Sequence, residues 1–270
     1  MPVVLYPATR RGTAESGRPN EHGVRVTGCA MTPFDQAAQV RGLISRETAT
    51  DGDKAAVAGW LQRVCRAAVR DLPAMGVGIS LLSQGIDPLP VAASNETSVL
   101  VEELQFVMGE GPCIDAYASR SPVLVPDLSA TAATTWPGYA PAAHLHGVRA
   151  VFAFPLQIGA ARLGALDVYR DHTGSLSPAT LSRALTFAEV AMQGLLDDGT
   201  GSSGAAELFD DMDGNRLEVY QAQGMVMAQL DISAEQALMR LRAYAFAHER
   251  RAIDVARDVI ARKLILESDA

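Results

Sequence analysis

The last quarter of the chain carries apolar side chains at helical spacing. Residues three or four positions apart lie on one face of a helix. Leu217, Tyr220, Gly224 and Met227 recur at these intervals, and the pattern breaks near Leu230. We therefore expect a first helix that ends there and buries this apolar face.

Two further helical patterns follow. Ser233 with Gln236 three residues later has the form of a capping box, in which each side chain bonds the other residue's backbone at a helix start. The apolar positions of these two helices are Ala237, Leu238, Leu241, Tyr244 and Ala245, then Val255, Ala256, Val259 and Ile260. Short helices that share one apolar core predict an all-α three-helix bundle over residues 205–270.

Nearer the amino terminus the apolar residues alternate, which is typical of strands. The predicted strands cover residues 77–81, 89–93, 122–125, 150–158 and 163–169, with turns at 84–88 and 159–160. In the last hairpin, Phe152 and Phe154 alternate in phase with Leu166 and Val168, so these side chains should share one face of the sheet.

Helical spacing before and between these strands completes the first domain. The predicted helices begin near Asp53 and cover 97–107 and 136–146. Antiparallel strands with helices before, between and after them predict an α+β domain, an antiparallel sheet flanked by helices, over residues 53–196. Cys65 lies beside the apolar stripe of the first helix, and we expect it to pack rather than react.

A length of 270 residues suggests two domains. Residues 1–50, rich in Gly, Pro, Arg, Thr and Ala without periodicity, predict a flexible leader, and residues 197–204 a flexible linker. No apolar run approaches the ~20 residues of a membrane span. The amino terminus also lacks the pattern of a secretion signal, so we expect a cytoplasmic protein without a membrane partner.

A heptad stripe precedes the predicted linker. Leu181, Leu185, Ala188, Met192 and Leu195 follow the spacing of a two-helix seam. Two interpretations fit this stripe: it joins two copies into a homodimer, or it packs on the sheet of its own chain.

Part of the predicted bundle carries a local excess of positive charge. The formal net charge is -8, yet the segment 240–263 is locally basic. Its cations are Arg240, Arg242, Arg250, Arg251, Arg257, Arg262 and Lys263, and its acids are Glu249, Asp254 and Asp258. Such a face attracts phosphate locally. The alternative is a solvated helix face whose arginines pair with those acids.

Several segments of the bundle together resemble the ANTAR domain. They are 221–227 (QAQGMVM), 233–237 (SAEQA), 241–245 (LRAYA) and 254–256 (DVA), in that family's order and spacing. The resemblance covers about the last fifty-five residues. It implies a module of transcription antitermination regulators that binds paired short RNA hairpins, typically as a dimer. Gln223, where many members have lysine, and His248, where asparagine is frequent, depart from the family pattern.

The chemistry of hairpin recognition selects the candidate contacts. Hairpins are read through phosphates and splayed bases, which suit arginine forks and planar side chains. The candidate RNA-binding residues are Gln223, Arg240, Arg242, Tyr244, His248, Arg250, Arg251 and Arg257. Tyr244 also fits core packing, and His248 also fits a cap at the helix end.

The first domain resembles the GAF domain, a signal-sensing fold that is joined to ANTAR modules in actinobacterial-type regulators. The residues that carry the resemblance are 109–113 (GEGPC), Trp136-Pro137, 152–156 (FAFPL) and 163–166 (LGAL). It implies a small-molecule pocket. Candidate pocket residues are Cys113, Tyr117, Trp136, Tyr139, His144, His146, Phe152 and Tyr169.

The sequence identifies neither a cofactor nor a metal site. Cys29, Cys65 and Cys113 lack metal-ligand spacing, and His144 and His146, two positions apart, point apart on a helix. Cys113 follows a proline at a helix start, where the helix dipole can activate a thiol, although free cysteines are more often buried and inert.

Two functions fit these residues and resemblances. The first is a cytoplasmic, signal-responsive RNA-binding regulator that prevents transcription termination and is not an enzyme. The alternative is a thiol-dependent redox enzyme or redox sensor that uses Cys113, for which no second cysteine or catalytic constellation lies at recognisable spacing. DNA binding is weaker still, because no helix-turn-helix spacing stands out.

Overall fold

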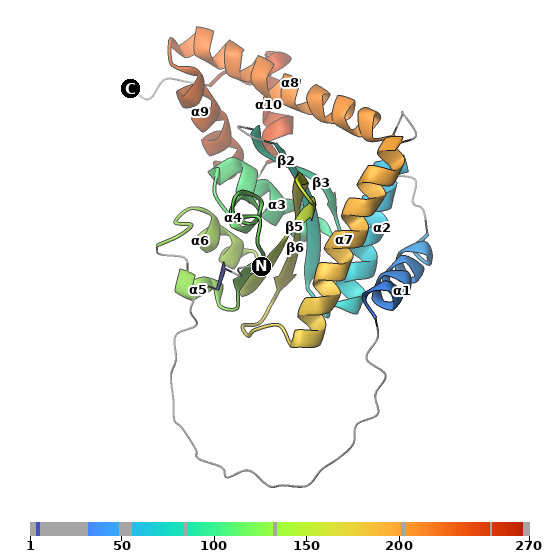
Figure 1. The fold of residues 1–270 in the computed structure, drawn as a ribbon. Coiled ribbons are helices and arrows are strands. Elements are labelled where there is room, and N and C mark those ends of the chain that lie inside the picture. Colours follow the sequence, from blue (N-terminus) through green and yellow to red (C-terminus); the bar gives the residue numbers. More distant parts are fainter. Residues whose placement is uncertain are drawn as a thin grey trace, which may run out of the picture.

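The computed structural model of the protein describes residues 4–5, 32–48, 56–83, 86–131, 134–200, 204–248 and 250–266. Figure 1 shows a sheet with helices on both faces and a group of helices at one end of it. In the part of the chain described, no helix is both long and apolar enough to cross a membrane.

The sheet has the strand order β1-β4-β5-β6-β2-β3. The strands are β1 (Val4–Leu5), β2 (Gly76–Ser83), β3 (Ile86–Ala93), β4 (Val123–Val125), β5 (Ala150–Ile158) and β6 (Ala161–Arg170). All neighbours pair antiparallel except β1, which runs parallel to β4. The predicted antiparallel sheet and its last hairpin are confirmed. β3 begins at Ile86, inside the turn predicted at 84–88.

Two layers of helices cover the sheet. One face carries α1 (Pro33–Ser45), α2 (Ala56–Asp71) and α7 (Pro178–Thr200), and the other carries α3 (Glu96–Met108), α4 (Pro112–Ser119), α5 (Leu128–Thr131) and α6 (Tyr139–Leu145). Each helix layer packs on one face of the sheet and forms a separate core, and alternate side chains of the strands point into the two cores. Phe152 and Phe154 enter the first core with Leu166 and Val168, as predicted, whereas Val151 enters the second.

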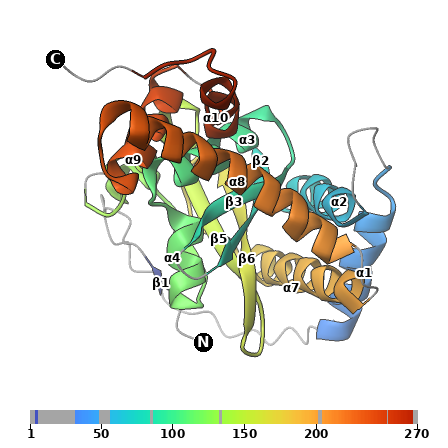
Figure 2. The same ribbon diagram turned by 90° about the horizontal axis from the view of Figure 1, so that it is seen from above.

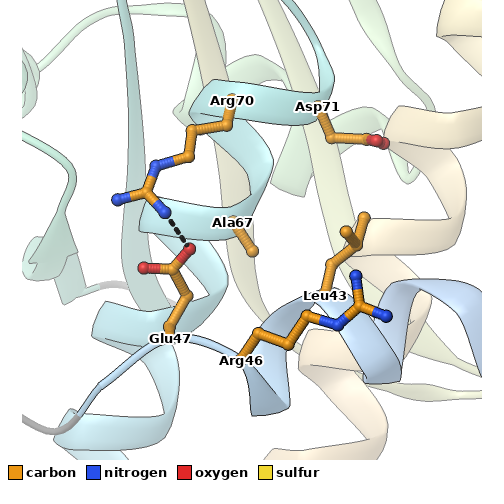
Figure 3. Close-up of a pocket in the computed structure, with 6 residues that line it drawn as sticks. All are labelled: Leu43, Arg46, Glu47, Ala67, Arg70 and Asp71. Carbon is orange, nitrogen blue, oxygen red and sulfur yellow. Dashed lines mark hydrogen bonds and ion pairs between the residues drawn. The ribbon is translucent and has the colours of Figure 1, made fainter.

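Helix α1 corrects the prediction of a flexible leader over residues 1–50 for its own span, 33–45, whereas residues 1–3, 6–31 and 49–50 of that predicted leader lie outside the described residues. Thr32 and Asp35 form a capping box at its start, and Val40 and Ile44 are fully buried in the first core. The apolar stripe of α1 is short, with Ala37, Val40, Leu43 and Ile44 on the first core, and it follows a long segment without periodicity. An ion pair holds the end of α1 on α2: Arg70 Nη1 lies 2.7 Å from Glu47 Oε1. Figure 3 shows this pair.

The shallow pocket of about 290 Å³ in Figure 3 lies between α1 and α2. Its acidic walls are already paired. Asp71 accepts a charged hydrogen bond from Arg183 on α7, with Arg183 Nε 2.5 Å from Asp71 Oδ2. We therefore read the charged groups here as fastening three helices together, because paired charges at a helix junction stabilise its geometry.

Helix α7 resolves part of the ambiguity of its heptad stripe. Ala188, Met192 and Leu195 are buried in the first core, whereas Leu185 is 42% exposed. The stripe thus packs mainly within its own chain and does not by itself require a second copy. The helix also continues through residues 197–200, so helical backbone occupies the first half of the predicted linker.

The carboxy-terminal helices form the predicted bundle. They are α8 (Gly204–Leu230), α9 (Ala234–Ala247) and α10 (Ala252–Ile260), and the capping box of Ser233 and Gln236 is present at the start of α9. Their shared core contains Ala237, Leu241, Ala245, Val255, Ala256 and Val259. Figure 2 shows α8 crossing above the sheet, with α9 and α10 near α3.

The buried face of α8 differs from the predicted one. Leu217 and Tyr220 are 67% and 46% exposed, and Gly224 is exposed. Ala222 and Val226 are fully buried instead. Helix α8 carries two apolar stripes, and the packing of α10 selects the one that spacing alone did not single out.

Candidate functional sites

The segment 109–113 organises three helices around one turn. Gly109 ends α3 in the left-handed conformation, with φ 66°. Glu110 Oε1 accepts hydrogen bonds from the backbone N of Gly138 (2.6 Å) and of Tyr139 (2.9 Å), and so caps α6. Gly111 has φ 146°, and a Cβ there would overlap Gln105. Pro112 then begins α4. The glycines and the acid of this segment therefore have structural roles.

A group of polar side chains is buried between α3 and the sheet. This interior polar cluster comprises Ser80, Glu102, Gln105, Asp167 and Tyr169. Close packing of α3 on β2 makes it possible, because a Cβ on Gly78 would overlap the Glu102 carboxylate. Glycine at this strand position therefore leaves the space that the carboxylate fills.

Glu102 is held from two strands. Ser80 Oγ on β2 donates to Glu102 Oε2 at 2.6 Å, and the Tyr169 hydroxyl on β6 donates to Glu102 Oε1 at 2.6 Å. Both bonds stabilise the carboxylate, yet burial dominates and raises the pKa of Glu102 from 4.5 to about 7. Glu102 therefore titrates near neutral pH.

Asp167 is the second buried acid of the cluster. Gln105 Nε2 donates to Asp167 Oδ2 at 2.6 Å, and Gln105 Oε1 accepts from the backbone N of Cys113 at 2.8 Å. Asp167 Oδ1 is buried and has no hydrogen-bond partner among the described residues. Burial, followed by the nearby Glu102 charge, raises the pKa of Asp167 well above its usual range. The pair of acids thus retains a proton near neutral pH.

The predicted pocket residues do not form one group. Trp136 and Tyr139 meet edge to face, with ring centroids 6.0 Å apart, in the same core as Tyr169. Tyr117 packs beside Cys113, and Arg162 lies 4.4 Å above its ring. The structure corrects two placements: Phe152 faces the opposite core, because alternation turns it away from Tyr169, and His144 and His146 lie only half-buried near the end of α6.

The Cys113 thiol does not have the surroundings of a nucleophile. It is fully buried, and burial, followed by the nearby charges of Asp167 and Glu102, raises its pKa well above the usual value. A reactive cysteine needs the thiolate form and access to solvent. Burial therefore outweighs any lowering of the thiol pKa by the dipole at the α4 amino terminus, and the redox alternative is not favoured.

Candidate RNA-binding side chains lie on the exposed side of α9. The rings of Tyr244 and His248 stack with centroids 3.9 Å apart and planes 18° apart. His248 ends α9, and its Nδ1 lies 2.9 Å from the Tyr244 carbonyl oxygen, so Nδ1 carries the proton that is donated. Tyr244 is half-buried at the edge of the bundle core and His248 is exposed.

The arginines and Gln223 occupy different settings. Arg250 binds Asp258 (2.6 Å), and Arg257 lies 3.8 Å from Asp254, which are pairs of the kind that the sequence left as an alternative. Arg257 also binds Glu218 on α8 (2.7 Å), an acid that the alternative did not include. The Arg242 guanidinium lies 4.9 Å above the Phe106 ring of α3, and Arg251 Nε lies 4.0 Å from Glu103. Arg240 is half-buried on α9. Gln223 Nε2 donates to the Ala234 carbonyl oxygen at 2.6 Å, which ties α8 to α9.

Sequence reasoning missed the acids that matter most in this structure. Glu102 and Glu103 interrupt an apolar helix, and Asp167 shares the inward strand face of Ala165 and Tyr169. Acids at positions that the pattern buries are the signal that would have identified them.

Two family models match the chain. Residues 55–196 match the GAF domain, and residues 214–260 match the ANTAR domain. Because the first match spans more than half of the chain, the protein belongs to the GAF domain family, and an ANTAR domain follows. No curated protein matches it.

Solved structures with a similar fold are distant. The GAF domain of an Acinetobacter phosphoenolpyruvate-protein phosphotransferase is 13% identical, with a TM-score of 0.47 over 63% of this chain and 96% of that chain. The corresponding Coxiella burnetii domain is 14% identical (TM-score 0.47; 65% and 100% covered). A free methionine-R-sulfoxide reductase from Neisseria meningitidis is 16% identical (TM-score 0.42; 60% and 87% covered). Likeness at this level says nothing about what this chain binds.

Proposed function

We propose that this protein is a signal-responsive regulator whose bundle binds hairpins in nascent transcripts and prevents transcription termination. The observation that carries the proposal is the ANTAR match over a bundle with exposed planar and basic side chains. We place this regulator in the cytoplasm, where nascent transcripts are made.

The α9 surface has the chemistry for a hairpin loop. Arg240, Tyr244 and His248 are four residues apart, so they lie on the same side of the helix. His248 is exposed, and its ring can extend the existing stack with an unpaired base. Arg262 and Lys263, exposed just after α10, add positive charge for phosphates.

The GAF domain supplies the sensing part of the proposal. We assign a small-molecule signal to the side of the sheet that holds the interior polar cluster, because Asp167 Oδ1 is a buried acceptor there that none of the described residues satisfies. We further propose that the regulator acts as a homodimer. The exposed apolar residues Leu217 and Tyr220 on α8 are suited to contact a second copy.

The test is a mobility-shift titration of purified full-length protein against hairpins selected from a transcribed RNA pool. His248→Ala should weaken binding by at least ~1 kcal/mol, the magnitude of one lost base–aromatic stack. Arg240→Ala should weaken binding and reduce the dependence of log affinity on log salt by about one, as expected for one phosphate contact.

Arg46→Ala is the matched control, because Arg46 is an exposed arginine at the end of α1. Its affinity and salt dependence should equal those of the unmodified protein. Equal losses in the control and the two α9 variants would show that binding is non-specific charge attraction and would refute the α9 surface.

A further inference from the structure

Helix α3 faces both domains at once. Glu102 and Gln105 point into the interior polar cluster of the GAF domain. Glu103, Phe106 and Val107 instead contact the bundle, because positions three and four apart share the opposite side of a helix. A single rigid element therefore touches both the proposed sensing region and the proposed RNA-binding module.

The contact of Glu103 with α10 completes that helix. Glu103 Oε1 accepts a hydrogen bond from the backbone N of Ala252, the first residue of α10, at 2.8 Å. Arg251 is the N-cap residue and provides no side-chain cap of its own. An acid at a helix amino terminus satisfies a free N–H and complements the helix dipole. The GAF domain thus supplies the cap that the ANTAR sequence lacks.

Apolar packing surrounds this cap. Val107 is only 8% exposed and belongs to the bundle core, and Phe106 lies against Arg242 of α9. A groove of about 640 Å³ runs beside the contact between α3, α6, α9 and the start of α10. Leu145, 84% exposed, and Phe246, 45% exposed, line it. The junction is therefore closed at the cap and open along one side, as suits a contact that separates.

We propose that α3 is a latch that holds the bundle against the GAF domain and restrains RNA binding until it opens. This rests on the proposed function. In the closed arrangement, Arg242 is packed on Phe106 and the charge of Arg251 is offset by Glu103. Movement of α3 within the GAF domain breaks the cap on α10 and frees both arginines for phosphates.

The first test measures amide hydrogen exchange of the full chain by mass spectrometry at the peptide that contains Ala252. Glu103→Ala should accelerate exchange there by about tenfold, the factor expected when one helix cap is lost. Glu103→Gln keeps an acceptor oxygen and should stay near the unmodified rate. Glu96→Ala, an exposed acid on the same helix, is the control. Unchanged exchange in Glu103→Ala would overturn the latch.

The second test measures hairpin affinity of the same variants. Glu103→Ala should bind selected hairpins about fivefold to tenfold more tightly, because the closed population is lost. Phe106→Ala, which loosens the junction through a different contact, should act in the same direction. Faster exchange with unchanged or weaker affinity would overturn the masking of the arginines. If neither the unmodified protein nor any variant bound hairpins, the proposed function would be wrong. Faster exchange in Glu103→Ala would then still support the latch contact between α3 and α10.

Discussion

Glu102 should make the stability of the GAF domain depend on pH. Its folded-state pKa is about 7, against 4.5 for an exposed glutamate, because burial disfavours the charged form. One pH unit between these values corresponds to about 1.4 kcal/mol. The folded state binds the proton more tightly than the unfolded chain, so this contribution is fully present below pH 4.5 and is lost as pH rises through 7.

The magnitude is roughly 3 kcal/mol across that window. Glu102→Gln keeps the shape of the side chain, and Ser80 can rotate its hydroxyl to accept from the new amide. Burial is the main cause that raises the pKa of Asp167, and the substitution removes the second cause, the Glu102 charge. The free energy of unfolding of the variant should therefore change less between pH 5 and 8 than that of the unmodified protein, and the remaining change should come from Asp167, whose pKa burial still raises.

Urea unfolding followed by tryptophan fluorescence is the assay, since Trp60 and Trp136, the only tryptophans of the chain, both lie in the GAF domain. The exposed acid Glu189 on α7 provides the control, Glu189→Gln, which should retain the full pH dependence. A fall of the same size in Glu102→Gln as in the unmodified protein would refute the assignment of the titration to Glu102.

Three further outcomes follow from single positions. Gly78→Ala should destabilise the GAF domain by roughly 1–3 kcal/mol in the same unfolding assay, because its Cβ overlaps Glu102; a neutral effect would show that α3 moves freely on β2. Cys113 in the folded protein should resist thiol labelling, read by peptide mass, and should label readily in urea; rapid native labelling would reopen the redox alternative. Ser233→Ala should lower bundle stability by about 1 kcal/mol in thermal melts followed by circular dichroism, and an unchanged melt would mean that the capping box is dispensable.

Periodicity predicted the elements whose apolar residues define a single buried face. The hairpin of β5 and β6 alternates cleanly, and α9 has one dominant apolar stripe after a capping box, so both follow from local sequence. The buried face of α8 could not be predicted in this way, because Leu217 and Val219 belong to different apolar faces of the helix. Which face is buried depends on the packing of α10 against α8.

The candidate sites depended on contacts between distant segments. The bond from Ala252 to Glu103 spans 149 positions, and no local pattern announces it. The separation of Phe152 from Tyr169 was already implied by the predicted hairpin, because Phe152 shares a face with Val168 and alternation puts Tyr169 on the other face. The sequence shows Asp167 as an acid at an inward position of a strand. It does not show that Gln105 and Tyr169 are the hydrogen-bond partners of that acid.

The measurement closest to the central claim is transcription through a terminator in vitro. A hairpin selected by the purified protein is placed upstream of the terminator, and read-through by RNA polymerase is compared with and without protein. Read-through should rise with protein concentration, and His248→Ala should shift this rise to higher concentration. Read-through that stays constant while the hairpin is bound would contradict antitermination as the function of this bundle.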